Sequence, residues 1–448
     1  MTITRDLAEW VAGLQGSDLP VEVRERVKDI LLDTVASALA GHDAGDVATV
    51  VRLASALGGG SGTSIIGGDR LSLGGATLVN GYLVTAATMC DIHRPTACNV
   101  TPEVVPPAMA IGEREGSTGD RFLAAMAAGL EVTTRVGLGL KPSAFRARGW
   151  HAAGVTGVFG AAASTGRLLG LDAASQTWAF GLAGSQASGT YAQLGTPAIK
   201  FQQAHGAHGG LIAALLARDG FNAAEDALMA PDGDLFSAYS DGGNPGVVLA
   251  GLGMDWELAR ISLRAWPVAV HLQPVVTGLL AILGTFDGAP ADIERVTVTM
   301  SEAAYGMTGR GTWDDRFRAR LSAPYVTGVV LFDRRCWLEQ FAPARLQDEA
   351  LSAFIRDRVV IAAEAGRRDG TAVIEIMRRG GRSLREEVTV PKGEPANALS
   401  RADVVNKFRA AASPHLSAAA TNTVIDMVGS LETLPSVRPL VGALRRSG

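Results

Sequence analysis

The chain has 448 residues and a formal net charge of −4, and 47% of its residues are hydrophobic against 19% charged. This composition excludes a disordered chain, and the dispersed positive residues argue against nucleic-acid binding. Cys90, Cys98 and Cys336 are too few for a disulfide framework or a four-ligand zinc site, so we expect a reducing, cytoplasmic location. No apolar run reaches about 18 residues, so no membrane span is expected.

Apolar residues at helical spacing predict helix after helix over the first part of the chain. Segment 21–41 places Val23, Val27 and Leu31 on one side and ends at a glycine, as helix C-termini commonly do. Further helices are predicted at 75–89, 119–137, 152–170 and 209–220. Their many Ala, Gly, Ser and Thr residues favour close packing in a buried bundle. Residues 64–68 are at most one turn or a short extended piece.

The pattern changes near residue 264. One helix is predicted at 274–283. Alternating apolar and polar residues predict strands at 295–301, 371–377 and 385–390. From residue 400 onward the pattern returns to helix.

These segments predict a mainly α protein with an inserted domain. Helical patterns occupy both chain ends, and strand patterns are confined to the part between them. The economical arrangement is a large all-helical domain built from residues 1–263 and 398–448, with a smaller α+β domain, residues 264–397, inserted between its two parts.

Several titratable side chains gather in segment 89–110, which interrupts two helices with a loop that is expected to end at Pro106 and Pro107. Loops held between rigid helices commonly carry catalytic groups. Asp91 and His93 stand two residues apart and are candidates for a carboxylate–imidazole pair that transfers protons near neutral pH. An Asp–His pair at the surface, without chemistry, is an equally good interpretation.

A second group surrounds His151, just before the helix expected at 152–170. The helix dipole at this end favours a neutral imidazole or a bound anion, so His151 is a candidate for proton transfer. Arg146 and Arg148 precede it and are candidates for binding a carboxylate through paired hydrogen bonds. The alternative is a histidine that only caps the helix, beside arginines that are only solvated.

A third group contains five polar side chains, Tyr191, Thr196, Lys200, His205 and His208. The two histidines are three residues apart, so a helix would place them on one face. No third ligand is evident, and a metal site is not predicted. In weakly charged surroundings Lys200 would act as a base with a lowered pKa or as a cation that holds a carboxylate.

At the expected domain change, Arg264 and His271 lie on either side of a Trp-Pro corner. Junctions between domains are favoured places for small-molecule pockets, which makes both residues candidate substrate ligands. Hinge packing by Trp266 and Pro267 is an equally good interpretation, and it is compatible with a binding role.

Taken in order, these segments resemble the MmgE/PrpD family, which contains dehydratases, decarboxylases and epimerases of small carboxylic acids. The likeness covers most of the first 270 residues and is carried by VKDILLDTVASALAG, SIIGGDRLSLGGATLVNGYL, VVPPAMAIGE, FLAAMAAGLEVTTRVG, RGWHAAGVTGVFGAAASTGRLLGLD, WAFGLAGSQASGTYAQLGT, LIAALLARDGF and RAWP. The resemblance implies a helical domain with a smaller inserted domain, and a homodimer. It also implies acid–base chemistry, without metal or organic cofactor, in a cleft between the domains.

The resemblance extends to individual positions only in part. The family's histidine after the GW/GF turn corresponds to His151, and the last of its aspartates to Asp91. Its lysine after the GT turn corresponds to Lys200 when a one-residue shift is allowed. Other residues stand at the remaining positions where the family has histidine, aspartate or lysine, namely Thr85, Thr88, Asn99, Arg264 and Gln273.

Together these observations predict a cofactor-independent lyase or isomerase that abstracts a proton α to a carboxylate or carbonyl of a small organic acid. Its expected residues are His151, Lys200, Asp91 and His93 for catalysis, and Arg148, Arg264, Thr196, Tyr191, His271 and Asn99 for substrate binding. The expected partners are a small carboxylate substrate and a second copy of the chain. Two other functions stay open: a scaffold reused for cyclisation or condensation in a biosynthetic pathway, and a relative that binds a small molecule without catalysis.

Overall fold

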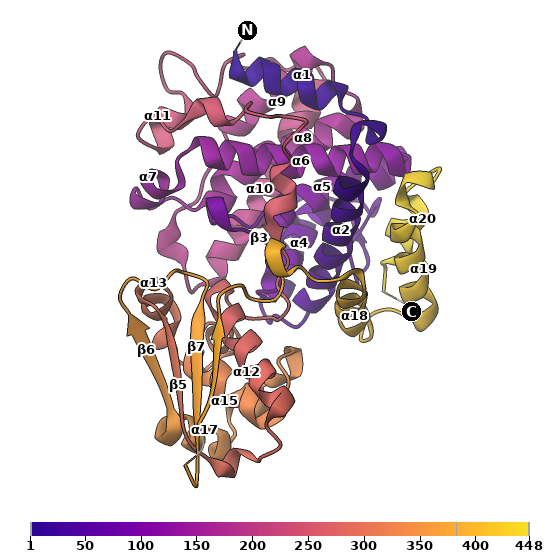
Figure 1. Cartoon of the computed structure of the whole chain (residues 1–448). Coiled ribbons are helices and arrows are strands. Elements are labelled where there is room, and N and C mark those ends of the chain that lie inside the picture. The colour runs from indigo at the N-terminus through magenta and orange to yellow at the C-terminus, as the bar shows by residue number, and fades with distance from the viewer. Residues whose placement is uncertain (1, 382, 447–448) are drawn as a thin grey trace. The chain divides into compact units, whose positions relative to one another are not determined.

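The computed structural model describes residues 2–381 and 383–446, which fall into two compact units (Figure 1). The helical unit contains the chain up to Ala86, Cys90–Ser262 and the residues from Ser400 onward. The α/β unit contains Ala87–Met89 and Leu263–Leu399. The prediction of a mainly α protein is confirmed. Among the described residues, no helix combines the length and apolar character needed to cross a bilayer.

The helical unit is a bundle in which α8 packs against both α6 and α10 (Figure 1). Its helices are α1 (Ile3–Gly13), α2 (Val21–Gly41), α3 (Val47–Leu57), α4 (Leu73–Ala86), α5 (Thr101–Glu115), α6 (Gly119–Gly139), α7 (Pro142–Ala147), α8 (Ala152–Leu169), α9 (Ala173–Gly184), α10 (Pro197–Arg218), α11 (Leu235–Tyr239), α18 (Arg401–Ala412), α19 (Ala418–Gly429) and α20 (Arg438–Ala443). Two short strand pairs, β1 (Thr63–Ser64) with β2 (Arg70–Leu71) and β3 (Ile92–His93) with β4 (Ile261–Ser262), complete it.

Helix α10 begins twelve residues earlier than its apolar pattern predicts, at Pro197 instead of residue 209. Thr196 precedes it as the N-cap residue, and a proline at the first helical position loses no hydrogen bond. The glycines at 206, 209 and 210 weaken the helical pattern in the sequence. The added turns matter for function because they place Lys200 on a buried helix instead of a loop.

Helices α8 and α10 approach closely because a glycine stands at their contact. A Cβ atom at Gly210 would lie 2.3 Å from Ala161 Cβ and 2.6 Å from Val158 O. Because the backbone cannot move aside cheaply, we expect Gly210→Ala to lower the free energy of unfolding by about 1–3 kcal/mol. Urea unfolding of this variant measures the loss, with Gly442→Ala as the control, since a Cβ at Gly442 meets no atom within 4 Å. Equal stability of the two variants would contradict this packing.

Helix α5 corrects the expectation of a loop that runs to Pro106 and Pro107. The helix begins at Thr101 and includes Pro102, Pro106 and Pro107. Pro102 stands in the first turn, where the backbone N–H has no helical partner. The other two prolines each remove a backbone hydrogen bond, and burial of α5 against α4 and α8 outweighs that loss. The loop prediction is therefore wrong from Thr101 onward.

The α/β unit is built on a four-stranded sheet in the order β6-β5-β7-β8. Its elements are α12 (Gln273–Thr285), β5 (Ile293–Ser301), α13 (Glu302–Ala304), α14 (Arg316–Arg320), α15 (Ala323–Asp333), α16 (Pro343–Leu346), α17 (Glu349–Arg358), β6 (Val359–Glu364), β7 (Ala372–Arg378) and β8 (Ser383–Val388). Strands β5 and β6 are parallel, whereas the other neighbours are antiparallel. Only β6 was not predicted, because VVIAAE does not alternate and directly follows α17.

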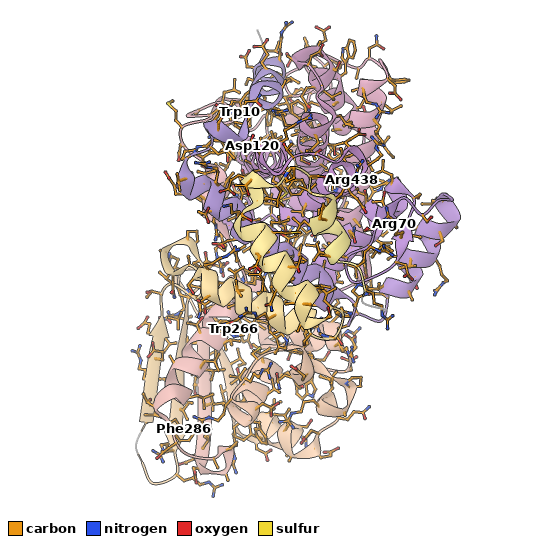
Figure 2. The ribbon with its side chains drawn as sticks, turned by 90° about the vertical axis from the view of Figure 1, so that its right-hand side faces the viewer. Trp10, Arg70, Asp120, Trp266, Phe286 and Arg438 are labelled. Atoms are coloured by element: carbon orange, nitrogen blue, oxygen red, sulfur yellow. The ribbon has the colours of Figure 1, made fainter. Side chains whose placement is uncertain are left out.

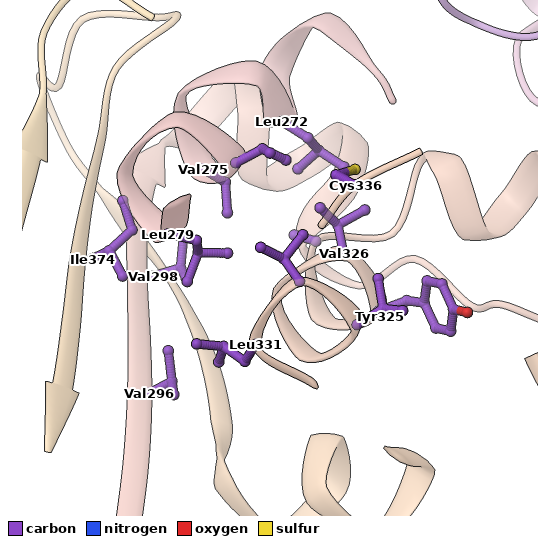
Figure 3. Packing of buried hydrophobic residues seen from close by; sticks show 14 of the residues in the cluster. Leu272, Val275, Leu279, Val296, Val298, Tyr325, Val326, Leu331, Cys336 and Ile374 are labelled. Atoms are coloured by element: carbon purple, nitrogen blue, oxygen red, sulfur yellow. The ribbon is translucent and has the colours of Figure 1, made fainter. Parts of the chain in front are cut away.

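The core of this unit lies between the sheet and two helices (Figure 3). Val275 and Leu279 of α12 face Val298 of β5 and Ile374 of β7. A Cβ atom at Gly278 would lie 2.4 Å from Ile374 Cδ1, so this glycine allows α12 to approach the sheet.

Cationic side chains attach α18 and α20 to the first part of the helical unit. Lys407 Nζ of α18 donates to Asp33 Oδ1 of α2 at 2.7 Å, and both side chains are buried. Arg438 of α20, labelled in Figure 2, donates through Nε to Glu113 O at the end of α5 at 2.8 Å. These contacts join segments that are more than 300 residues apart in the sequence.

Candidate active site

His151 is held at the N-terminus of α8 by two extended segments that pair with each other. Its backbone N–H donates to Gly189 O at 3.0 Å, and Tyr191 N–H donates to Gly149 O at 2.8 Å. Gly149 and Gly189 have φ values of 83° and 122°, which glycine adopts without strain. As a result His151 lies beside the segment that leads into α10, and its side chain is only 6% exposed.

The neighbouring Gln202 of α10 sets the tautomer of His151. Gln202 Nε2 donates to Thr190 O at 3.0 Å, so its Oε1 faces His151 Nδ1, at 2.8 Å. An amide oxygen can only accept, and therefore Nδ1 carries the proton of the neutral imidazole. The lone pair is then on Nε2, which makes no hydrogen bond with any residue that the structure describes.

Burial lowers the pKa of His151 to about 4, and the positive charge of Arg146 adds to this effect while the hydrogen bond to Gln202 opposes it. The imidazole is therefore neutral at pH 7. A neutral imidazole with its Nε2 lone pair available is a proton acceptor, which is the state that a general base requires.

The lowered pKa predicts how stability depends on pH. Between about pH 4 and 6.5 the imidazole of His151 binds fewer protons in the folded chain than in the unfolded chain. Its contribution to stability is complete above about pH 6.5 and is lost as the pH falls toward 4. We expect the wild type to lose on the order of 2 kcal/mol more than His151→Asn between pH 7 and pH 5. Urea unfolding at both pH values measures the difference, and an equal loss in both proteins would show that His151 titrates normally.

Tyr191 and Arg146 complete the surroundings of His151. The Tyr191 ring stands edge-on to the imidazole with centroids 6.1 Å apart, and the Arg146 guanidinium lies 3.5 Å from the centroid of the same ring. Arg148 is exposed and donates to Ser237 O at 3.4 Å instead. Of the two arginines considered from the sequence, the structure thus places Arg146 nearest to His151.

Lys200 lies on the second turn of α10, two residues before Gln202. Its side chain is buried, and Nζ donates to Ala86 O at 2.7 Å. Ala86 is the last residue of α4, where the helix dipole favours a cation. Thr196, also predicted to bind substrate, is the exposed N-cap residue of α10, and its hydroxyl donates to Gln193 O.

The expected Asp91–His93 pair does not form. The two ring nitrogens of His93 face Thr96 Oγ1 at 2.9 Å and Glu257 Oε2 at 3.2 Å. Asp91 instead accepts from the backbone N–H groups of Val100 and Thr101 at the start of α5, at 2.8 and 3.1 Å. Both side chains are fully buried. Residues two apart on an extended strand point to the same face, so the spacing alone would allow the pair, and it is not made because each side chain contacts other partners.

Asn99 was expected to bind substrate. Its side-chain Nδ2 donates to the backbone carbonyl of Asp91, so it holds the two ends of the short turn before α5 together.

Arg264 and His271 belong to the α/β unit. Arg264 Nη1 donates to Thr88 O at 3.1 Å, and Thr88 has a φ of 56°, which is uncommon for a β-branched residue. His271 Nδ1 lies 3.3 Å from Asp369 Oδ1, and this contact holds the pKa of the Asp369 carboxyl below its usual value. Gln273 donates to two backbone carbonyls of the Trp-Pro corner and so stabilises that turn.

His205 and His208 both lie on α10. Across residues 2–381 and 383–446, no three His, Cys, Asp or Glu side chains are arranged to hold a metal ion.

Gln202 was not predicted from the sequence, because a glutamine in a helix gives no indication of function until its partner is known. Only its position two residues after Lys200 would have suggested that it belongs to the same site.

The comparisons with known proteins cover nearly the whole chain. The model of the MmgE/PrpD N-terminal domain matches residues 5–247, and that of the MmgE/PrpD C-terminal domain matches residues 266–433. The cis-aconitate decarboxylase-like protein oryM of Aspergillus oryzae is 26% identical, over 99% of this chain and 97% of the relative. The cis-aconitate decarboxylase of Aspergillus terreus is 26% identical over 99% and 96%, and that of Homo sapiens 23% identical over 99% and 95%. The chain therefore belongs to the MmgE/PrpD family and is an enzyme of the lyase type.

Proposed function

We propose that the chain is a lyase that acts on a small acid with two or three carboxylates, through an enolate intermediate. The observation that carries the proposal is His151, a buried and neutral imidazole with its lone pair on Nε2. The buried cation Lys200 lies on α10 two residues before Gln202, which orients that imidazole. A base and a cation supplied by adjacent helices are the two groups that enolate chemistry requires.

The bonds that break and form in each reaction determine the roles of His151 and Lys200. In a decarboxylation, the bond from the α-carbon to one carboxylate breaks, CO₂ leaves, and the electron pair becomes an enolate conjugated with another carboxylate. Lys200 stabilises this charge and gives a proton to the carbon. In an elimination, Nε2 of His151 takes the α-proton, and the electron pair then expels the leaving group from the neighbouring carbon. In both reactions Lys200 would bind a carboxylate, whereas Nε2 of His151 would act as the proton acceptor of the elimination.

The relatives named as cis-aconitate decarboxylases support decarboxylation as the first activity to test. The purified protein should be incubated with cis-aconitate while CO₂ release is measured. In a parallel sample in deuterated buffer, NMR should detect deuterium incorporation at the carbon next to a carboxylate. Product, or exchange at that carbon, is the expected result. Binding of several small polycarboxylates without product or exchange would contradict the proposal and favour a relative that only binds them.

A further inference from the structure

One buried acid in the helical unit has no place in the site described so far. Glu103 is the third residue of α5, is fully buried, and neither of its carboxyl oxygens has a hydrogen-bond partner among the described residues. A carboxyl in the first turn of a helix ordinarily accepts from free backbone N–H groups there. In α5 Asp91 accepts from the N–H groups of Val100 and Thr101 instead.

The space for Glu103 is created by glycines on the two helices that carry His151 and Lys200. A Cβ atom at Gly157 of α8 would lie 2.3 Å from Glu103 Cγ, and one at Gly206 of α10 would lie 3.2 Å from the same atom. Glycine is an unfavourable residue inside a helix. Two helix-destabilising glycines and a buried carboxyl without a hydrogen-bond partner thus occur together. Each lowers the stability of the fold, which indicates that the carboxyl of Glu103 has a function.

A second unpartnered polar atom lies in the direction of Lys200. Gln203 is on α10, one turn before Gly206 and one turn after Lys200, so these three residues follow one another along the same side of the helix. Its side chain is 3% exposed, and its Oε1 accepts no hydrogen bond from any described residue. An acid that can donate and an amide oxygen that can accept are thus both buried and unpartnered, the first beside Gly206 and the second one turn before Gly206 on α10.

We propose that Glu103 is a neutral, proton-donating residue that acts through Lys200. It holds a proton in the interior of the helical unit and supplies it to Lys200 after each turnover. This inference rests on the proposed function. In a decarboxylation the substrate carbon gains one proton for each CO₂ released. When Lys200 Nζ supplies that proton, the Glu103 O–H bond breaks and an N–H bond forms on Lys200, by way of water bound between Glu103 and Gln203. The Glu103 carboxylate then takes a proton from solvent, and Glu103 itself does not touch the substrate.

The charges around Glu103 support its neutral state. Burial raises the pKa of the Glu103 carboxyl well above its usual value, and the negative charge of Asp91 raises it further. Neighbouring Cys98 is also fully buried, and burial raises the pKa of its thiol well above its usual value. Burial and the charge of Asp91 therefore disfavour a negative charge on Glu103.

Infrared spectroscopy tests the protonation state without any substrate. The difference spectrum between the wild type and Glu103→Gln at pH 7 should contain the C=O stretching band of one protonated carboxyl. If Glu103→Gln does not fold, Glu103→Met, which fills the same gap, replaces it. A difference spectrum that shows only an ionised carboxylate would overturn the inference.

Turnover by the same variants tests the transfer. Glu103→Gln keeps the shape and a donor but has no transferable proton, so kcat should fall about tenfold or more, with KM little changed and a larger solvent deuterium isotope effect on kcat. Gln176→Leu is the control, because Gln176 is another buried glutamine without side-chain partners among the described residues, on α9. Its kcat should equal that of the wild type.

The outcomes separate this inference from the proposed function. If the wild type turns over an acid and Glu103→Gln does so at the same rate, the inference fails and the proposed function stands. If the infrared band is present but the wild type turns over none of the acids, the proposed function fails, and the role of Glu103 fails with it.

Discussion

Replacement of His151 by alanine should lower kcat by about two orders of magnitude or more, while the thermal unfolding temperature stays close to that of the wild type. The large effect is expected in elimination and in exchange of the α-proton, because Nε2 is the proton acceptor there and no neighbouring group offers an equivalent lone pair in the same place. Stability should change little, because the contact to Gln202 is made by a side chain that is itself partly exposed.

The matched control for His151 is His205→Ala. His205 is exposed on α10, in the same unit, and should leave kcat unchanged. His151→Asn adds a further test, because its amide can still donate to Gln202 but cannot accept a proton as imidazole does. If His151→Asn retained full turnover, proton transfer by this residue would be refuted, whatever the alanine variant did.

Replacement of Lys407 by methionine should lower the free energy of unfolding by about 3–5 kcal/mol, because it leaves the buried carboxylate of Asp33 without its cation. Asp33 is 1% exposed, and its Oδ2 has no hydrogen-bond partner in the described part of the chain. Burial already raises the pKa of this carboxyl, which shows how unfavourable its charge is there. Urea unfolding followed by circular dichroism measures the loss.

Two further variants show whether the loss at Lys407 comes from an unpaired charge. In the double variant Asp33→Asn with Lys407→Met, the charge is removed together with its partner, and most of the stability should return. Arg5→Met breaks the exposed Arg5–Glu9 pair of α1 and should cost less than about 1 kcal/mol. If Lys407→Met cost no more than Arg5→Met, the buried pair would not stabilise the attachment of α18.

Much of the fold could be predicted because the local pattern and the tertiary environment agree. Helix α2 has the bounds that its apolar spacing predicts, 21–41, and three of the four large strands follow from alternation. The errors lie where packing overrides the local pattern. Prolines do not interrupt α5, because its burial outweighs the lost hydrogen bonds. Glycines weaken the helical pattern over the first turns of α10, although they are needed there for the close contact with α8.

The candidate site was predictable in its residue types and less so in its pairings. His151 and Lys200 were identified from their surroundings in the sequence, and the structure places both at the starts of adjacent buried helices. Asp91 and His93 were paired by their spacing, but their partners come from residues up to 164 positions away. Glu103 was missed, although an acid directly before the apolar stretch 104–112 is a signal in the sequence.

The protonation state of His151 is the most direct measurement. With ¹⁵N-labelled histidine, NMR at pH 6 should show a neutral ring with its proton on Nδ1, and addition of cis-aconitate should shift the Nε2 resonance while a resonance from His205 stays in place. A His151 ring that is protonated at pH 6, or that does not respond to any small polycarboxylate, would contradict the base that the proposed lyase chemistry requires.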